Sequence, residues 1–166
     1  MSESTSPNTT IRPLRMSDHA RLVALWRECG IKQEAEDSIA NFERFLESPL
    51  SRGFGAIDSL EIVGTVLCGS DARYGYIHHL AVSPSYRRSG IATALVDECM
   101  RFLVSTCGLK TIAVFVWQTN TSGQQFWRGS GFDEIKGLNI LVKEAPLAAT
   151  EKKDEDGRAP PMEKNE

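Results

Sequence analysis

Apolar residues recur along the chain in short runs separated by polar turns, a pattern that is typical of strands. Five such runs, rich in β-branched and aromatic residues, predict strands over Ile11–Leu14, Phe54–Ile57, Ile62–Cys68, Tyr74–Val82 and Thr111–Trp117. The polar pair Asp58-Ser59 joins the second run to the third, and Ser83-Pro84 ends the fourth. A last hairpin is expected over Phe132–Val142.

Four other segments repeat their apolar residues at helical spacing. The first follows the capping pair Ser17-Asp18, has Leu22, Leu25 and Trp26 on one face and stops at Gly30. The other three helices are expected over Asp37–Glu47, Ile91 to about Val104, and Thr121–Arg128. Strands mixed with helices in this way predict an α+β fold, with a mixed, mostly antiparallel sheet flanked by helices.

The two ends of the chain lack this periodicity. Residues 1–10 are polar, and Glu151–Glu166 is charged and contains Pro160-Pro161 but no aromatic residue. Neither stretch can bury enough apolar surface to offset the entropy of ordering it. We therefore expect one folded domain over residues 11–145, with a disordered N-terminus (1–10) and a disordered charged tail (146–166).

Composition narrows the classes of function. The 166 residues include 19 Lys and Arg and 22 Asp and Glu, a net charge of −3, which argues against non-specific binding to nucleic acid. No apolar run is long enough to span a membrane, and the polar start does not form a secretory signal. The four cysteines show no C-x-x-C pair or metal-ligand spacing, so we expect reduced thiols. These features predict a cytoplasmic protein that binds neither membrane nor nucleic acid.

The most informative segment runs from Leu80 to Ala92, where a strand leads through a loop with two arginines into a long helix. The first turn of a helix has free N–H groups and the positive end of the helix dipole, and both favour an anion. Gly90 lets a phosphate approach the backbone, and Arg87 or Arg88 can add charge-assisted hydrogen bonds. The chain lacks G-x-x-x-x-G-K-[ST] and G-x-G-x-x-G, which excludes a P-loop NTPase and a Rossmann dinucleotide site. The alternative is an ordinary strand-loop-helix with solvated arginines.

The wider pattern resembles the GCN5-related N-acetyltransferase (GNAT) superfamily. Arg87-x-x-Gly90-x-Ala92 after Leu-Ala-Val is similar to the pyrophosphate-binding motif of that superfamily. The opening Ile-Arg-Pro-Leu-Arg-x-x-Asp, the Ile-Val-Gly-Thr strand, and Asn120 with Phe126-Trp127-x-x-x-Gly131-Phe132 follow in family order. Leu25-Trp26-x-x-Cys29 and Asp37-x-Ile39 are also similar to a bacterial single-domain branch. The resemblance covers nearly the whole expected domain.

The resemblance implies acetyl-CoA as cosubstrate, no metal, and a central strand that splays from its neighbour beside the coenzyme. In this superfamily the backbone amides of the loop and first helical turn hold the pyrophosphate. The matching positions here are Arg87, Arg88, Ser89, Gly90, Ile91, Ala92 and Thr93. The strand end that would pair with the pantetheine arm consists of Leu80, Ala81 and Val82. Asn120 matches a position that often contacts the coenzyme arm, and a plain helix cap is the alternative.

The chemistry needs a base, because an alkylamine with a pKa of about 10.4 is almost fully protonated at pH 7. Strand alternation puts Tyr76 and His78 on one face of Tyr74–Val82 and His79 on the other. Superfamily members that acetylate arylalkylamines keep two histidines at the positions of Tyr76 and His78. The resemblance therefore makes His78 the expected base and Tyr76 its helper. The alternative is that both histidines only pack within the sheet.

The general acid is where the chain departs from its relatives. Many members carry a tyrosine, aligned with the departing sulfur, at the position of Trp127, and an indole N–H cannot give up its proton at useful pH. Trp127 would pack against the coenzyme or fill the core. The expected function is direct transfer of an acetyl group from acetyl-CoA to a primary amine on a small molecule, protein or peptide, and a homodimer is compatible with it. The alternative is a coenzyme-A-binding sensor or interaction module that has lost the chemistry.

Overall fold

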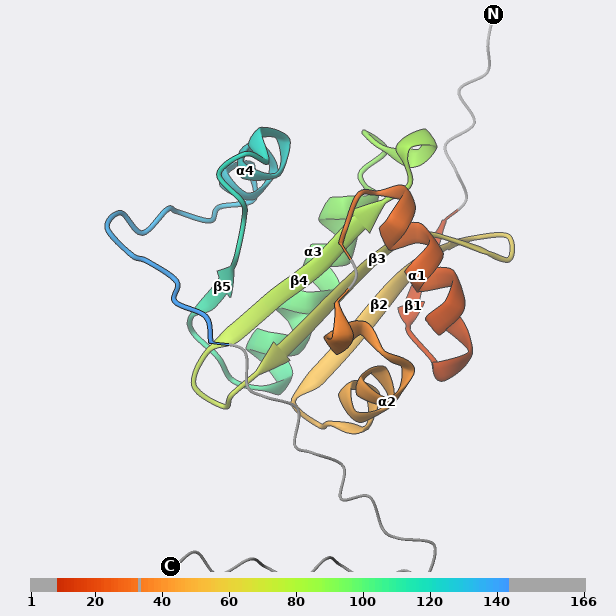
Figure 1. Ribbon diagram of the computed structural model, residues 1–166, viewed down its shortest axis with the longest axis horizontal. Coiled ribbons are helices and arrows are strands. Elements are labelled where there is room, and N and C mark those ends of the chain that lie inside the picture. The colour runs from red at the N-terminus through yellow and green to blue at the C-terminus, as the bar shows by residue number, and fades with distance from the viewer. Residues whose placement is uncertain (1–8, 33, 144–166) are drawn as a thin grey trace, which may run out of the picture. The chain divides into compact units, whose positions relative to one another are not determined.

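A five-stranded sheet in the order β1-β2-β3-β4-β5 forms the centre of the computed structural model, which describes residues 9–32 and 34–143 (Figure 1). The strands are β1 Thr10–Pro13, β2 Ser51–Asp58, β3 Glu61–Ser70, β4 Gly75–Val82 and β5 Ile112–Val114. The first four pair antiparallel, and β5 pairs parallel with β4. The expected α+β class with a mixed, mostly antiparallel sheet is confirmed.

Helices cover both faces of this sheet (Figure 1). The α-helices are α1 His19–Glu28, α2 Ile39–Glu47, α3 Ile91–Met100 and α4 Thr121–Gly129. Shorter turns are η1 Met16–Asp18, η2 Ala35–Asp37, η3 Pro84–Tyr86 and the π-helical continuation of α3, η4 Arg101–Thr106. The core consists of two clusters of buried residues, one between the sheet and α3 and the other between the sheet and the layer of α1 and α2.

The β3 strand contributes to both clusters because its successive side chains alternate between the faces of the sheet. Val66 and Cys68 pack on the α3 side, and Leu67 packs on the side of α1 and α2. This is why the sequence from Ile62 to Cys68 is mostly apolar, with Gly64 and Thr65 as the exceptions, rather than an apolar–polar alternation.

A β-bulge interrupts β4. The register pairs Leu67 with His78 but Thr65 with Ala81, so two residues of β4 oppose one residue of β3. His79 within the bulge has φ +52°, a left-handed conformation that is uncommon for any residue other than glycine.

The bulge overturns the expectation that His78 and His79 lie on opposite faces of the strand. His78 packs edge-on to Phe45 of α2, and His79 packs on Trp26 of α1, so both imidazoles lie on the same side of the sheet. The physical reason is that an extra residue shifts the alternation by one position, and the sequence pattern does not reveal such an insertion.

The parallel strands β4 and β5 splay apart, as expected. Only Gly75–Ile77 of β4 pairs with β5. Beyond Ile77, β4 continues to Val82, and no strand of the described residues pairs with that edge. The edge therefore leaves backbone N–H and C=O groups available to another extended chain.

The C-terminal elements differ most from the expectation. The strand expected over Thr111–Trp117 is limited to Ile112–Val114. Residues up to Phe132 form one compact unit, and 133–143 fall in a second, where no strand is described. The expected hairpin is therefore wrong over these residues: Gly137, with φ +79°, makes a turn, but its flanks form no ladder. Apolar alternation favours a strand, whereas the strand itself requires a pairing partner.

Three further expectations concern the ends, the cysteines and membrane spans. Residues 1–8 and 144–166 lie outside the described residues, and Thr10 already belongs to β1. All four cysteines are free thiols, as expected. Within 9–32 and 34–143, no helix has the length and apolar character needed to cross a membrane.

Candidate active site

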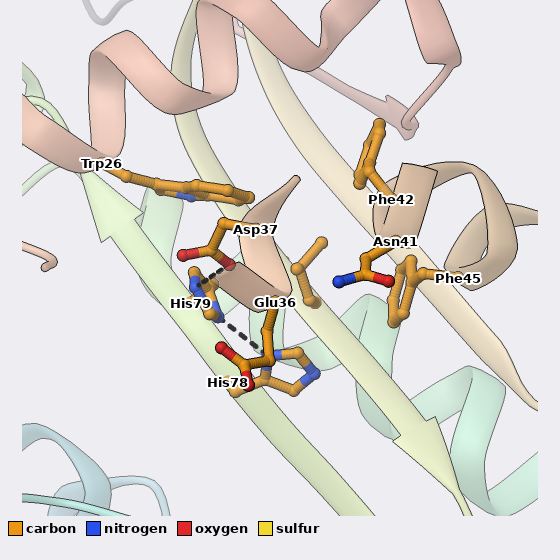
Figure 2. Close-up of a pocket in the computed structure, with 9 residues that line it drawn as sticks. Trp26, Glu36, Asp37, Asn41, Phe42, Phe45, His78 and His79 are labelled. Atoms are coloured by element: carbon orange, nitrogen blue, oxygen red, sulfur yellow. Dashed lines mark hydrogen bonds and ion pairs between the residues drawn. The ribbon is translucent and has the colours of Figure 1, made fainter. Parts of the chain in front are cut away.

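A pocket of about 200 Å³ opens between β4 and the layer of α1 and α2 (Figure 2). Nine residues line it: Trp26, Glu36, Asp37, Asn41, Phe42, Phe45, Leu67, His78 and His79. Its walls are mostly apolar or aromatic, and its polar groups are two carboxylates, one amide and two imidazoles. Among residues 9–32 and 34–143, no Lys or Arg contributes to the lining.

Three of these side chains are connected in a row, drawn with dashed lines in Figure 2. Asp37 Oδ1 lies 3.0 Å from His79 Nε2, and His79 Nδ1 lies 2.9 Å from His78 Nδ1. Asp37 comes from η2, whereas the two histidines are neighbours on β4. The row therefore exists only because the bulge turns both imidazoles toward η2.

The surroundings of the two imidazoles favour their neutral forms. His78 keeps solvent-exposed surface, but loss of hydration in the pocket, followed by the neighbouring charge of His79, lowers the pKa of His78 to about 4. Burial also lowers the pKa of His79, and Asp37 opposes that shift. Both histidines are therefore neutral at pH 7 and able to accept a proton.

A buried hydrogen-bond chain holds the bulge in place. Trp26 Nε1–H donates to Thr65 Oγ1 at 2.9 Å, and the Thr65 hydroxyl donates to the backbone carbonyl of His79 at 3.2 Å. The Trp26 ring also packs against the His79 imidazole, with 4.6 Å between ring centroids. Trp26 and Thr65 are fully buried, so the strained backbone of His79 is supported by groups that have no access to water.

The structure groups the expected catalytic residues differently from the sequence analysis. Tyr76 stacks on Phe115, with ring centroids 6.1 Å apart, and does not line the pocket. His78 instead contacts His79, and Asp37 completes the row. The sequence analysis gave Asp37 no catalytic part. The feature that singled it out was Asp37-x-Ile39, which is similar to the bacterial single-domain branch of the superfamily.

At the other end of β4, the loop to α3 has the features expected of an anion site. Gly90 caps α3 in a left-handed conformation (φ +84°), no side chain caps the helix, and its first turn has no acidic residue. The first-turn amides of Ile91, Ala92 and Thr93 therefore remain available to an anion. Arg88 is exposed and has φ +63°.

Other contacts fix the shape of this loop. Arg87 Nε–H donates to the carbonyl of Val82 at 3.1 Å. The Tyr86 hydroxyl donates to Asp58 Oδ2 at 2.7 Å. Ser89 is exposed next to Gly90. Both arginines are exposed, and Arg87 also braces the loop through its hydrogen bond to Val82.

The remaining residues that the sequence analysis expected to bind the coenzyme lie in three different parts of the structure. Leu80, Ala81 and Val82 form the open edge of β4. Asn120 caps α4 by accepting a hydrogen bond from the Gly123 N–H at 2.9 Å, so the capping alternative is observed and a coenzyme contact stays a prediction. Trp127 is buried and packs on Phe132 at a centroid distance of 5.0 Å, which favours the core-filling alternative.

Comparison with known proteins decides the family. Residues 19–132, well over half of the chain, match the acetyltransferase (GNAT) family. The chain belongs to this family. The recognition made from the loop and strand motifs is confirmed, and with it the enzyme class, a GNAT acetyltransferase. Among the described residues of this GNAT chain, no group of three or more His, Cys, Asp or Glu side chains could hold a metal ion.

Solved structures with this GNAT fold include aminoglycoside acetyltransferases. AAC(6')-Iy in complex with a bisubstrate analogue has a TM-score of 0.71 and 18% identity, covering 83% of this chain and 99% of the other. A predicted acetyltransferase from Clostridium acetobutylicum with acetyl-CoA has a TM-score of 0.67 and 20% identity, covering 81% and 96%. AAC(6')-Ih from Acinetobacter baumannii has a TM-score of 0.68 and 17% identity, covering 84% and 100%. At sequence identities of 17% to 20%, these similarities show that the chain shares the fold of these proteins.

Proposed function

We propose that this GNAT protein transfers the acetyl group of acetyl-CoA to a primary amine bound in the pocket beside His78. The observation that carries the proposal is that one strand, β4, contributes both parts of the site. Its open edge, Leu80–Val82, leads to the uncapped start of α3, and His78 and His79 on the same strand line the pocket. Acetyl-CoA and bisubstrate complexes of structures with this fold support the proposal.

The coenzyme would be held along β4 and α3. Its pyrophosphate would accept hydrogen bonds from the first-turn amides of α3, with Arg88 adding charge, and its pantetheine arm would pair with the open edge of β4. The thioester would then lie near the pocket, because the arm would pair with the same strand that holds His78.

The pocket favours a primary amine on an apolar arm. Trp26, Phe42 and Phe45 supply apolar and aromatic walls, and Glu36 has no ion-pair partner among the described residues. Aromatic faces and a free carboxylate both attract an ammonium group. A substrate carboxylate would find no cation in the part of the lining that the structure describes, so α-amino acids should be poor acceptors.

The reaction transfers one acetyl group and releases one proton. The bound ammonium first loses a proton to His78, and the amine lone pair forms a C–N bond with the thioester carbonyl carbon. The C–S bond then breaks, and the second nitrogen proton passes to the departing thiolate directly or through water. The products are an N-substituted acetamide and coenzyme A, with one proton left for release from the histidines.

The test is a thiol-release assay with three acceptors that share one arm: phenethylamine, L-phenylalaninamide and L-phenylalanine. We expect turnover with the first two and at least a 10-fold lower kcat/KM with the carboxylate-bearing third. The amide controls for the substituent on the α-carbon, because it has a neutral group where phenylalanine has the carboxylate. Equal rates for all three would contradict the acceptor class, and absence of both turnover and a thermal shift with acetyl-CoA would contradict the function itself.

The alternative function, a coenzyme-A-binding sensor, is favoured by one observation. The residue at the expected acid position, Trp127, is buried in the core against Phe126 and Phe132 and offers no acidic proton. Tight binding of acetyl-CoA without turnover of any amine would support the sensor. Turnover of any amine would exclude it.

A further inference from the structure

We propose that Asp37 is a positioning residue: through His79 it holds His78 in the tautomer that leaves Nε2 free to take the proton of the acceptor amine. The inference rests on the proposed acetyl transfer and adds to it a defined chain of three residues from two distant parts of the sequence. It follows from the contacts of the row rather than from any family motif.

The hydrogen-bond partners determine the tautomer of each histidine, beginning with the histidine next to the Asp37 carboxylate. A carboxylate only accepts hydrogen bonds, so the His79 nitrogen 3.0 Å from Asp37, Nε2, must carry a proton. A neutral His79 then has a bare Nδ1, which must accept from the His78 Nδ1–H at 2.9 Å. This leaves His78 with its lone pair on Nε2, the one nitrogen of the row that makes no contact within it.

The same geometry gives the proton a route away from the substrate. When His78 Nε2 takes a proton from the ammonium, one N–H bond breaks and another forms. The His78 Nδ1 proton can then move across to His79 Nδ1. The result is a neutral His78 and a positively charged His79 beside the Asp37 carboxylate. The positive charge thus moves from the ammonium to a position next to a negative group, which offsets the cost of keeping it in a low-polarity pocket.

Three other titratable groups lie around the row, Glu34, Glu36 and His19, and none of them forms the contact that Asp37 makes with His79. Glu34 and Asp37 raise the pKa of His79, against the stronger effect of burial. Glu36 lines the pocket without contacting either imidazole through a hydrogen bond in the structure. His19 Nε2 lies 2.9 Å from the backbone carbonyl of Asp37, so it braces the turn that carries the carboxylate and stands outside the row.

The first test reads the tautomers directly and needs no turnover. The chain contains only three histidines, so ¹⁵N-imidazole NMR of the whole protein can be assigned with one His→Gln variant per residue. At pH 7 we expect His78 protonated on Nδ1 and His79 protonated on Nε2, with His19 on Nε2 as internal reference. In Asp37→Asn, His78 should become a mixture of tautomers. A wild-type His78 protonated on Nε2 would overturn the proposal.

The second test separates positioning from binding. Asp37→Asn should lower kcat roughly 10- to 100-fold, less than the loss of a general base, with little change in acetyl-CoA affinity. Glu36→Gln is the matched comparison, because Glu36 is a neighbouring carboxylate that forms no ion pair with any described residue. It should raise the acceptor KM while leaving the His78 tautomer unchanged. Asp37→Glu should restore part of kcat. An unchanged kcat in a folded Asp37→Asn protein would contradict the proposal.

The two tests also distinguish this inference from the proposed function. If the wild type turns over no amine, the acetyl transfer fails, yet the tautomers still decide whether Asp37 orients the histidine pair. If amines are acetylated and His78 carries its proton on Nε2, the transfer stands and the relay is wrong.

Discussion

At the scale of single residues, one backbone conformation decides which side chains can act together. His79 has φ +52°, and the bulge around it brings the imidazole of His79 within 2.9 Å of His78. In a regular strand the two rings would lie on opposite faces of the sheet. An uncommon left-handed conformation at a non-glycine residue costs about 1–3 kcal/mol and is frequent at functional sites.

The pH dependence of kcat tests the state of these histidines. An ordinary histidine has a pKa of 6.5, whereas the surroundings lower the pKa of His78 to about 4. Below its pKa the imidazole is protonated and cannot accept a proton, so activity is lost on acidification near 4 rather than near 6.5. We expect kcat to show no inflection between pH 5.5 and 7.5. A clear step at 6.5 would indicate a solvated His78 or another base.

At the scale of secondary-structure elements, the start of α3 depends on the backbone of Gly90. Its φ of +84° lies in the left-handed region, and a Cβ there would have open space, with nothing within 4 Å. Any cost of adding a side chain at this position therefore comes from backbone strain, since there is no neighbour to clash with.

Gly90→Ala should therefore lower the free energy of unfolding by about 1–2 kcal/mol and weaken acetyl-CoA binding. Gly129→Ala is the matched control, because that glycine lies in α4 with open space and no positive φ. The control should be neutral or stabilising by up to about 1 kcal/mol, with binding unchanged. Urea denaturation and coenzyme titration measure both quantities. Equal effects of the two variants would show that the loop needs no left-handed residue.

The bulge in β4 is an element-scale feature that depends on one buried hydroxyl. Thr65→Val keeps the shape of the side chain but leaves the Trp26 indole N–H and the His79 carbonyl without their partner. We expect a loss of about 1–3 kcal/mol in unfolding free energy, and a lower kcat as the histidine pair loses its alignment. Thr65→Ser, which keeps the hydroxyl, should retain most of kcat. Full activity in Thr65→Val would show that the bulge holds without this chain.

At the scale of the whole molecule, the limits of the folded unit can be placed by truncation. Thr10 pairs with Ile57 at the start of β1, so the first strand begins one residue before the expected domain boundary. A chain of residues 9–143 should keep the melting temperature and acetyl-CoA binding of the full protein. Starting at residue 14 instead removes β1 and should lower the melting temperature. A drop of several degrees for 9–143 would show that an end stabilises the domain.

The sequence alone was enough to predict the family and the fold class and to mark a candidate coenzyme loop, because these depend on local features. Apolar spacing defines the strands and helices, and Gly90 with its neighbouring arginines marks a helix start suited to an anion, whatever the rest of the chain does. Trp127 could also be singled out, since an indole cannot replace a phenol as an acid.

Only the tertiary structure decided which residues form the site. Asp37 lies 42 positions from His79 in the sequence, and no local pattern links a residue of η2 to a residue of β4. The bulge that joins them depends on Trp26 of α1 and Thr65 of β3, which meet only in the folded core. Strand pairing likewise depends on partners, which is why the hairpin predicted from the pattern after Phe132 is wrong over residues 133–143. Contacts between distant segments carry this information, and periodicity along one segment cannot.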